Sequence, residues 1–260
     1  MTLPNQLTRL QAVLFDMDGT LVDTEGLWQQ AVAAEADLLG LTLGPDDQPY
    51  ILGRAIEDTA EHLHGRLAAD AAAGPAGPSG PAAAVGPATA AVGPAADAAA
   101  ARMPLARLCT ALERRFAGLV QARVVPLPGV LDLLDELAAG GVTVALVSAS
   151  PRPVVDIVLK ALGRDRFAVS FAAGETPRTK PAPDPYLAAA EALGVDPSRC
   201  VAVEDTPTGI ASAEAAGCAV LAVPSAVPVQ AARGRTVVGS LLEVDLPLLR
   251  TLVRVGEAWG

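Results

Sequence analysis

The sequence predicts an α/β protein with a Rossmann-like parallel sheet as its core and a helical cap domain inserted into that core. Short apolar runs end abruptly in polar residues, which is typical of strands buried on both faces of a parallel sheet. Helical patterns alternate with these runs through the second half of the chain, which favours right-handed crossover connections. Residues 23–125 separate the first apolar run from the others and read as helices, as expected of an inserted domain.

The first apolar run, Ala12-Val13-Leu14-Phe15, leads directly into Asp16 and Asp18. Gly19 follows and allows a sharp turn. Acids at the carboxyl end of a buried strand lie where open α/β sheets bind ligands. Because two neighbouring carboxylates repel each other, we expect a hard cation such as Mg²⁺ beside them. A simple turn or a calcium loop is the alternative, although residues 20–22 lack the further acids that a calcium loop requires.

Length and composition narrow the class of protein. The chain has 260 residues, 51% of them hydrophobic, and a net charge of −10 without a basic tract. We therefore expect no nucleic-acid partner. Three scattered cysteines without metal-binding spacing predict neither a zinc site nor a disulfide framework, which fits a reducing cytoplasm. With no signal peptide or membrane-spanning run in view, the expected protein is cytoplasmic, away from membranes, and a monomer or weak homodimer.

We predict a helical cap domain over the inserted residues 23–125 and the core domain over residues 1–22 and 126–260. The first predicted helix of the cap carries apolar residues at helical spacing and ends at Gly40. From about residue 68 to 101 the composition collapses into Ala, Gly and Pro, which predicts a disordered insertion, with a linker that positions a partner as the alternative. The predicted helices of the cap are Leu27–Leu39, with an apolar stripe of Leu27, Ala31, Ala34 and Leu38, then Ile56–Leu67 and Pro104–Ala122.

The core domain predicts five strands with helices between them. Ser150 is a plausible cap for the helix after Pro151, and Asp184 for the helix that follows Pro185. The helix from Thr206-Pro207 closes at Gly217. The predicted strands are Ala12–Phe15, Val142–Val147, Phe167–Ala172, Cys200–Val203 and Ala219–Val223, and further predicted helices are Val130–Ala139, Tyr186–Leu193 and Leu246–Val255.

Polar residues after these strands are the candidates for chemistry. Ser148 follows the second strand and precedes a helix, where its hydroxyl and backbone N–H groups suit a phosphate oxygen, with a simple helix cap as the alternative. Glu204 and Asp205 follow the fourth strand and supply carboxylate oxygens for Mg²⁺, whereas a helix cap is the alternative for Asp205. The carboxyl ends of parallel strands share one edge, so these groups should lie near Asp16.

Lys180 is the remaining candidate. The chain has only two lysines, Lys160 and Lys180, so an ordinary surface charge is a less comfortable explanation for a lysine here. A compact ammonium can contact a phosphate and a carboxylate together. Lys180 is therefore a candidate for such a contact.

These stretches, in this order, resemble the haloacid dehalogenase-like superfamily of phosphotransferases. The resemblance covers nearly the whole chain except the Ala/Gly/Pro-rich segment, and it implies a role for each matching residue. Asp16 is expected to be the nucleophile and Asp18 the general acid and base, while Ser148, with Ala149, and Lys180 bind the phosphoryl group. Mg²⁺ is expected to bind the Asp16 side chain, the Asp18 main-chain carbonyl and Asp205, with Glu204 helping directly or through water.

The resemblance is greatest to the β-phosphoglucomutase-like branch and its sugar-phosphate phosphatases. Asp18 favours phosphate esters over halides, since true dehalogenases lack a carboxylate there. The mutase has a His near the position of Trp28 and an Arg near that of Ile56, and both departures favour hydrolysis. We therefore expect a Mg²⁺-dependent phosphatase of a small phosphorylated metabolite, preferably a sugar phosphate, acting through an aspartyl phosphate. A phosphomutase and a catalytically idle binding protein of the same fold are the alternatives.

Other candidates lie at or within the cap. Arg54 and Glu25 are candidate substrate-binding residues. Trp28 is expected to serve in packing rather than as a substrate platform. His62 and His64, two positions apart on one helix, face different directions, so we expect solvated histidines rather than a shared metal site.

Overall fold

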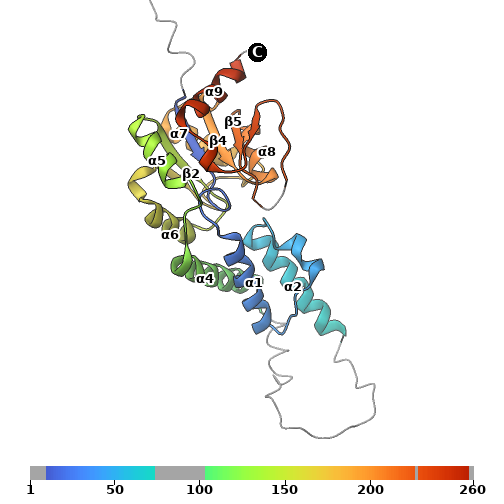
Figure 1. Cartoon of the computed structure of the whole chain (residues 1–260). Helices are drawn as coiled ribbons and strands as arrows, with labels where there is room; N and C mark the ends of the chain where they lie inside the picture. Colours follow the sequence, from blue (N-terminus) through green and yellow to red (C-terminus); the bar gives the residue numbers. More distant parts are fainter. Residues whose placement is uncertain (1–9, 74–102, 226–227, 258–260) are drawn as a thin grey trace, which may run out of the picture. The chain divides into compact units, whose positions relative to one another are not determined.

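A computed structural model describes residues 10–73, 103–225 and 228–257 of the chain (Figure 1). Two compact units are present, one within Met1–Leu27 and Ala117–Gly260 and the other within Trp28–Phe116. We refer to them as the core unit and the cap unit and describe each by itself. The predicted insertion, from residue 74 onwards, lies outside the described residues.

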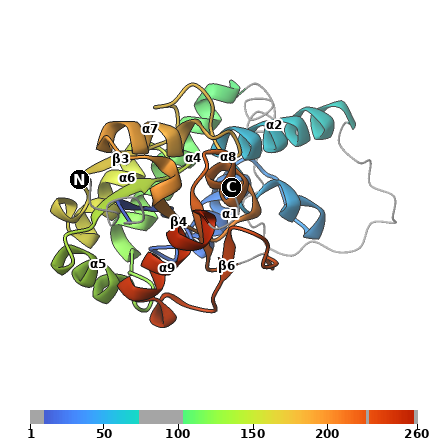
Figure 2. The ribbon, with the colours of Figure 1, turned by 90° about the horizontal axis from the view of Figure 1, so that it is seen from above.

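The core unit contains a six-stranded parallel sheet with the order β3-β2-β1-β4-β5-β6 (Figures 1 and 2). This confirms the predicted α/β class and all five predicted strands. The sixth strand was not predicted, because three residues of mixed polarity form no apolar run. The strands are β1 (Ala12–Phe15), β2 (Thr143–Val147), β3 (Val169–Phe171), β4 (Cys200–Glu204), β5 (Ala219–Ala222) and β6 (Arg235–Val237).

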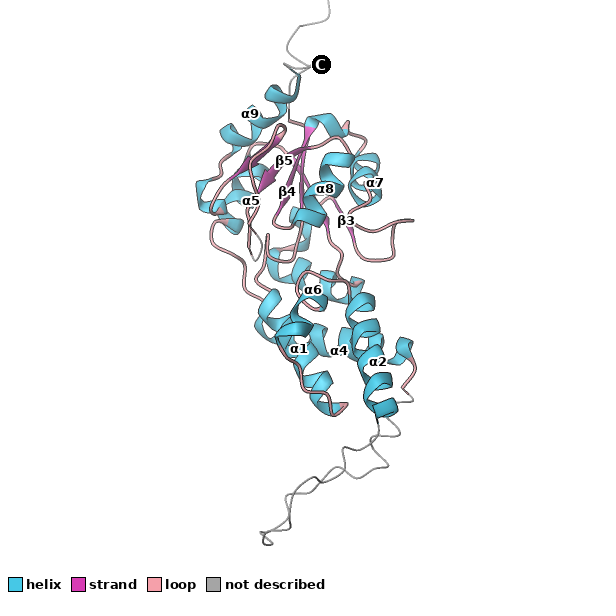
Figure 3. Ribbon diagram, turned by 90° about the vertical axis from the view of Figure 1, so that its right-hand side faces the viewer, coloured by secondary structure: helices cyan, strands magenta, loops and turns pink. Residues whose placement is uncertain are grey.

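Helices cover both faces of the sheet. Figure 3 shows α7 and α8 on one side of the strands and α5 and α9 on the other, in agreement with the contacts that these helices make. Each face is apolar, so β1 is completely buried on both sides. The helices of the core unit are α5 (Val130–Ala139), α6 (Arg152–Leu162), α7 (Asp184–Leu193), α8 (Pro207–Ala215) and α9 (Leu246–Glu257), with short 3₁₀ turns η2 (Arg164–Arg166), η3 (Pro197–Arg199) and η4 (Leu241–Glu243).

Small side chains let α7 and α8 approach the sheet closely. Alanines of both helices pack with alanines of the strands and with Cys200 of β4, and Tyr186 is the largest fully buried side chain of this layer. Dense packing of small residues brings the polar groups on α7 and at the start of α8 close to the end of β4. The fold thereby places several helix residues beside the polar strand ends.

Two predicted caps differ from the structure. The N-cap residue of α6 is Pro151, not the predicted Ser150, whose hydroxyl donates to Asp18 instead. Asp184 is the first residue of α7 rather than its cap, and it pairs with Arg178. The Thr206 cap is confirmed, since its Oγ1 accepts from the backbone N–H of Gly209.

The cap unit is helical, as the sequence predicts. Its elements are α1 (Glu25–Leu38), the 3₁₀ turn η1 (Pro45–Tyr50), α2 (Ile56–Ala73) and the first part of α4 (Leu105–Arg123). Two details of the prediction are wrong. Helix α2 continues into residues 68–73, because alanines favour helix until the first Gly-Pro pair. On α1, Leu38 is 70% exposed and Leu39 is buried in its place.

Among the described helices, none has both the length and the apolar character that a bilayer crossing would need.

Candidate active site

The ends of two neighbouring strands form the centre of the site. Asp16 follows β1 directly, and its backbone N–H donates to Val203 of β4 at 2.9 Å. Glu204 and Asp205 lie at the end of β4, which pairs with β1 in parallel register. One carboxylate oxygen from each of Asp16, Glu204 and Asp205 lies within 4.8 Å of the others. The structure thus brings together three of the predicted metal ligands.

Lys180 reaches the same cluster from the loop before α7. Its Nζ donates to Asp16 Oδ1 at 2.7 Å, to Glu204 Oε1 at 2.7 Å and to the Val147 carbonyl at 2.9 Å. Burial disfavours a charged amine, but the two carboxylates outweigh that cost and raise the pKa of Lys180 above its ordinary value. Lys180 is therefore a fixed ammonium that uses all three of its donors.

The acids are more numerous than one ammonium can balance. Burial, together with the nearby Glu204 and Asp205, raises the pKa of Asp16 well above its ordinary value, although Lys180 acts against this shift. Burial also raises the pKa of Asp205 to about 7. Both shifts mean that ionising these carboxyls is costly until further positive charge arrives.

Within this cluster of acids, two buried carboxylate oxygens have no hydrogen-bond partner, Oδ2 of Asp16 and Oδ1 of Asp205. An orphaned buried carboxylate oxygen is costly and rare in folded proteins. Oxygen atoms of clustered carboxylates are the ligands that Mg²⁺ prefers. The donor set and the two orphaned oxygens fit a hard divalent cation.

Asp18 lies two residues after Asp16, and three hydroxyl groups donate hydrogen bonds to its carboxylate. Thr24 Oγ1 donates to Asp18 Oδ1 at 2.6 Å, whereas Ser148 and Ser150 donate to Oδ2 at 3.1 and 2.8 Å. Ser148 is buried and its own Oγ accepts from the backbone N–H of Ser150. The predicted pair of Asp18 and Ser148 is therefore in direct contact, and Ala149 between the serines is exposed.

Gly19 makes the turn directly after the two aspartates possible. Its φ of +80° lies in the left-handed region, and a Cβ there would come within 2.1 Å of Asp205 Oδ2. The turn closes through the Gly19 N–H, which donates to the Val22 carbonyl at 2.8 Å. Both the backbone conformation and the space at this position therefore require glycine.

Glu204 is the most enclosed of the acids, with no exposed surface. Its Oε1 accepts from Tyr186 OH at 2.6 Å as well as from Lys180. Gly209 of α8 lies against the same carboxylate, since a Cβ on it would come within about 2 Å of both oxygens. The carboxylate is thus held by donors on one side and by the α8 backbone on the other.

The remaining predicted candidates have partners of their own. Arg54, in the cap unit, is exposed and donates to the Pro49 carbonyl at 3.0 Å. Glu25 is partly buried at the start of α1. For both, a contact with substrate stays a prediction. Trp28 donates from Nε1 to the Ile51 carbonyl at 2.9 Å and contacts Phe116 edge to face, so the expected packing role is confirmed.

The two histidines are not simply solvated, and that prediction is wrong. His62 Nε2 lies 2.7 Å from Asp47 Oδ1, and its ring stacks on Tyr50 with centroids 4.2 Å apart. His64 Nε2 lies 3.1 Å from the Met103 carbonyl. Helical spacing correctly separated the two rings, but it carries no information about partners on η1 or in the segment before α4.

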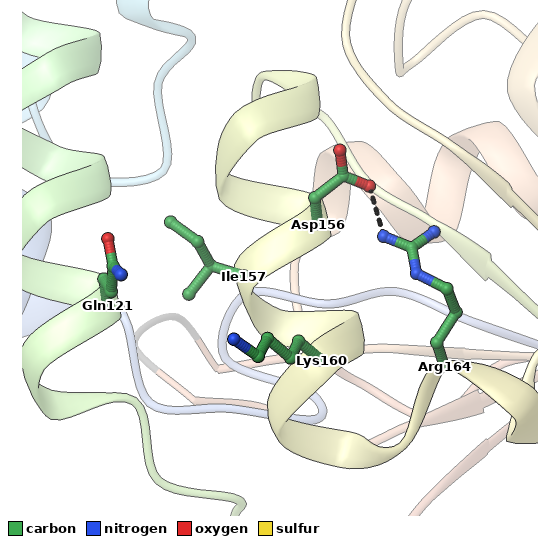
Figure 4. A pocket seen from close by; sticks show the side chains of 5 residues that line it. All are labelled: Gln121, Asp156, Ile157, Lys160 and Arg164. Atoms are coloured by element: carbon green, nitrogen blue, oxygen red, sulfur yellow. Dashed lines mark hydrogen bonds and ion pairs between the residues drawn. The ribbon is translucent and has the colours of Figure 1, made fainter.

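A hollow of about 500 Å³ lies elsewhere on the core unit, lined by residues of α4, α6 and η2 (Figure 4). Arg164 within it is paired with Asp156 at 2.7 Å. None of the predicted site residues lines this hollow, so we do not connect it with the chemistry. Its lining residues are Gln121, Asp156, Ile157, Lys160 and Arg164.

Four residues of the site escaped the sequence analysis as contacts of the acids. Thr24 and Ser150 bind Asp18, Tyr186 binds Glu204, and Ser225 donates to Asp205 Oδ2 at 2.5 Å. Ser225 had a usable signal, because it is a hydroxyl residue just beyond the fifth apolar run. Tyr186 had none, since a buried aromatic residue on a helix looks like ordinary core.

Comparison with known proteins agrees with this geometry. A family model described as haloacid dehalogenase-like hydrolase matches residues 10–217. The chain is 32% identical over 225 residues to "Protein CbbY" of Rhodobacter capsulatus, covering 83% of this chain and 86% of the relative. It is 33% identical over 217 residues to "Hexitol phosphatase A" of Escherichia coli K12, covering 83% of each.

A solved structure of a CbbY variant from Rhodobacter sphaeroides, in complex with xylulose-(1,5)bisphosphate, has the same fold. The TM-score is 0.71 at 24% identity, and the match covers 92% of this chain and 99% of the other. The fold thus agrees with this solved structure over nearly the full length of the chain.

Proposed function

Because the chain belongs to the haloacid dehalogenase-like hydrolases, we propose that it is a Mg²⁺-dependent phosphatase that hydrolyses a small sugar phosphate. The observation that carries the proposal is the buried contact of Lys180 with Asp16 and Glu204, beside two carboxylate oxygens without partners. An acidic protein needs local positive charge to hold a phosphate, and this is where the charge is placed. The relatives named as phosphatases support the same reaction class.

In the first step, a carboxylate oxygen of Asp16 attacks the phosphorus of the ester. A bond forms between that oxygen and phosphorus, and the bond from phosphorus to the sugar oxygen breaks. Asp18, in its protonated form, gives its proton to the departing oxygen, so the sugar leaves as an alcohol. Lys180 lies against Asp16 and offsets the negative charge of the approaching phosphoryl group.

In the second step, water attacks the aspartyl phosphate at Asp16. Asp18 takes a proton from that water, the phosphorus bond to Asp16 breaks, and inorganic phosphate leaves. Ser148 and Ser150 occupy Asp18 Oδ2 in the structure. A phosphoryl group bound at Ser148 would compete for this hydroxyl and so free Asp18 for proton transfer.

The cation would be held by Asp16, Asp205 and the Asp18 carbonyl, with Glu204 directly or through water. When bound, Mg²⁺ supplies positive charge that lets an anionic nucleophile approach an anionic ester. In the structure, Lys180 contacts Asp16, and the backbone turn at Gly19 leaves room for the Asp205 carboxylate.

The sugar-phosphate class rests on the names of the relatives. One is a hexitol phosphatase, and a CbbY structure contains xylulose-(1,5)bisphosphate. A polyol phosphate with several hydroxyl groups is common to both. We take this class, rather than an aromatic or nucleotide ester, as the substrate.

The test is release of inorganic phosphate from a panel of hexose, hexitol and pentulose phosphates, each with and without Mg²⁺. We expect release from at least one sugar phosphate, and only with Mg²⁺. Product analysis with a hexose 1-phosphate distinguishes the alternative mutase, which would yield the 6-phosphate instead of free phosphate. Release from no member of the panel would favour an idle binding protein and contradict the proposal.

A further inference from the structure

The three acids Asp16, Glu204 and Asp205 form the cluster that would hold the cation. In each acid, one carboxylate oxygen is fixed by a protein donor and the other has weak contacts or none. Lys180 fixes Asp16 Oδ1, and Oδ2 has no partner. Ser225 Oγ fixes Asp205 Oδ2, and Oδ1 has no partner. This repetition indicates that the donors leave one oxygen of each acid available to a cation.

Glu204 follows the same pattern. Its Oε1 accepts short hydrogen bonds from Tyr186 OH and Lys180 Nζ, whereas Oε2 accepts only longer ones, from the Asp205 N–H at 3.2 Å and the Thr206 hydroxyl at 3.5 Å. Tyr186 is completely buried on α7, and its ring lies 5.2 Å from Lys180 Nζ. Tyr186 therefore contacts two members of the cluster through one aromatic side chain.

Ser225 acts on the opposite side of the cluster. It lies just after β5 and is itself exposed, so it fills no gap in the core. Its hydroxyl contacts the Asp205 carboxylate next to the space that Gly19 leaves open. Because Ser225 does not contribute to core packing, its contact with the buried Asp205 carboxylate is best explained by an effect on that carboxylate.

We propose that Tyr186 and Ser225 are positioning residues for the cation, which hold Glu204 and Asp205 with one oxygen of each turned toward it. Groups that hold metal ligands in this way commonly change metal affinity by about 10- to 100-fold when removed. The inference rests on the proposed Mg²⁺ site. It extends that site to two hydroxyl groups that never touch the substrate in the proposed chemistry.

The experiment measures binding of Mn²⁺ alone, by electron paramagnetic resonance, to the full-length protein, with Mg²⁺ as competitor. We expect Tyr186→Phe and Ser225→Ala each to raise the Kd for Mn²⁺ by about tenfold or more. Ser225→Thr keeps a hydroxyl and should restore the wild-type value. The metal-free melting temperatures of Ser225→Ala and Ser225→Thr check that both variants are folded.

The chain offers a matched control for each change. Tyr50→Phe removes the only other tyrosine hydroxyl of the sequence. Ser198→Ala removes a serine that donates to a carboxylate, Asp196, at 2.8 Å and outside the cluster. Both controls should bind Mn²⁺ as the wild type does.

The outcomes separate the inference from the function on which it rests. Wild-type affinity in both Tyr186→Phe and Ser225→Ala, with binding lost in Asp205→Asn, would overturn the inference and leave the metal site standing. No Mn²⁺ binding by the wild type, or unchanged binding in Asp205→Asn, would overturn the proposed metal site itself. If Tyr186→Phe does not fold, the Ser225 pair of variants decides.

Discussion

Two buried carboxylates, one in each unit, are treated in opposite ways. Asp47 of the cap unit accepts from Arg66 at 2.8 and 2.7 Å, from Gly44 N–H at 2.7 Å and contacts His62 Nε2 at 2.7 Å. Asp205 of the core unit accepts from Ser225 and has one oxygen without a partner. Both are nearly inaccessible, with exposed fractions of 5% and 3%.

The pKa values reflect this difference in partners. Burial works against ionisation of Asp47, yet the surrounding donors lower its pKa to about 2. For Asp205 burial dominates and the pKa rises to about 7. A fully paired buried acid stabilises the fold, whereas one that is left short of partners is ready to bind something that the chain itself does not provide.

The largest effect should come from changing Asp16, the proposed nucleophile, at the underpaired site. Asp16→Asn should lower kcat by at least about 10⁴-fold, the scale seen when a group at the centre of covalent catalysis is lost. Phosphate release at saturating Mg²⁺ measures this, and Asp47→Asn is the control that changes a buried carboxylate outside the site. Turnover by a well-folded Asp16→Asn protein within about tenfold of wild type would contradict the role of Asp16.

Stability should respond in the other unit. Asp47→Ala should cost about 2 kcal/mol, because it removes charged hydrogen bonds and leaves Arg66 and His62 without their acceptor. Thermal unfolding of the metal-free protein measures the change. Mn²⁺ affinity should stay as in the wild type, and an unchanged melting temperature would show that Asp47 is not the anchor that its contacts suggest.

Lowering the pH should change the contributions of Asp205 and Asp47 to folding stability in opposite directions. Below a pH of about 7 the metal-free Asp205 carboxyl carries a proton, so apparent Mg²⁺ affinity should fall about tenfold per pH unit. Since the folded-state pKa is raised, this carboxyl contributes stability to the metal-free protein at low pH, and that contribution is lost as pH rises toward about 7. The pKa of Asp47 is shifted in the opposite direction, so the contribution of Asp47 to stability is present above pH 3.8 and is lost as the pH falls toward about 2.

Thermal unfolding with and without Mg²⁺ between about pH 5 and pH 8 checks the core-unit part of this prediction. The stabilisation by Mg²⁺ should grow with pH across that range. Asp205→Asn should remove the pH dependence that belongs to this carboxyl. A stabilisation that is independent of pH in the wild type would contradict the assignment.

The smallest effect should come from a fully partnered residue of the cap unit. Trp28→Phe removes the hydrogen bond to the Ile51 carbonyl and keeps an aromatic ring near Phe116, so it should cost about 1 kcal/mol. Melting temperature measures the loss, and KM for the sugar phosphate should not change. A raised KM at unchanged stability would instead make Trp28 a substrate contact.

The sequence was informative wherever a buried strand ends in a polar residue. Asp16, Ser148 and Glu204-Asp205 follow apolar runs, and parallel pairing brings such ends to one edge. Lys180 lies at no strand end and was identified by its chemistry and by the family resemblance. These residues lie together in the structure as expected.

What escaped prediction depends on contacts between distant segments. Ser150 was assigned to a helix end because a serine before a proline-containing helix usually caps it, and only the fold brings Asp18 within 2.8 Å of its hydroxyl. Asp47 lies on η1 and its side-chain partners His62 and Arg66 lie on α2, and no periodicity encodes that meeting. Strand β6 has too few residues, with an arginine among them, to give an apolar signal.

The position of β1 in the sheet bears on how the protein is made. This strand lies between β2 and β4, and Ala12 pairs with Thr143, 131 positions later, and with Cys200, 188 positions later. On the ribosome, β1 and Asp16 emerge early, and the backbone hydrogen-bonding groups at the edges of β1 stay unpaired until most of the polypeptide has been translated. Such late, long-range closure slows folding and leaves an adhesive edge exposed. Truncated translation products that stop before Cys200 are therefore expected to aggregate and to have no catalytic centre.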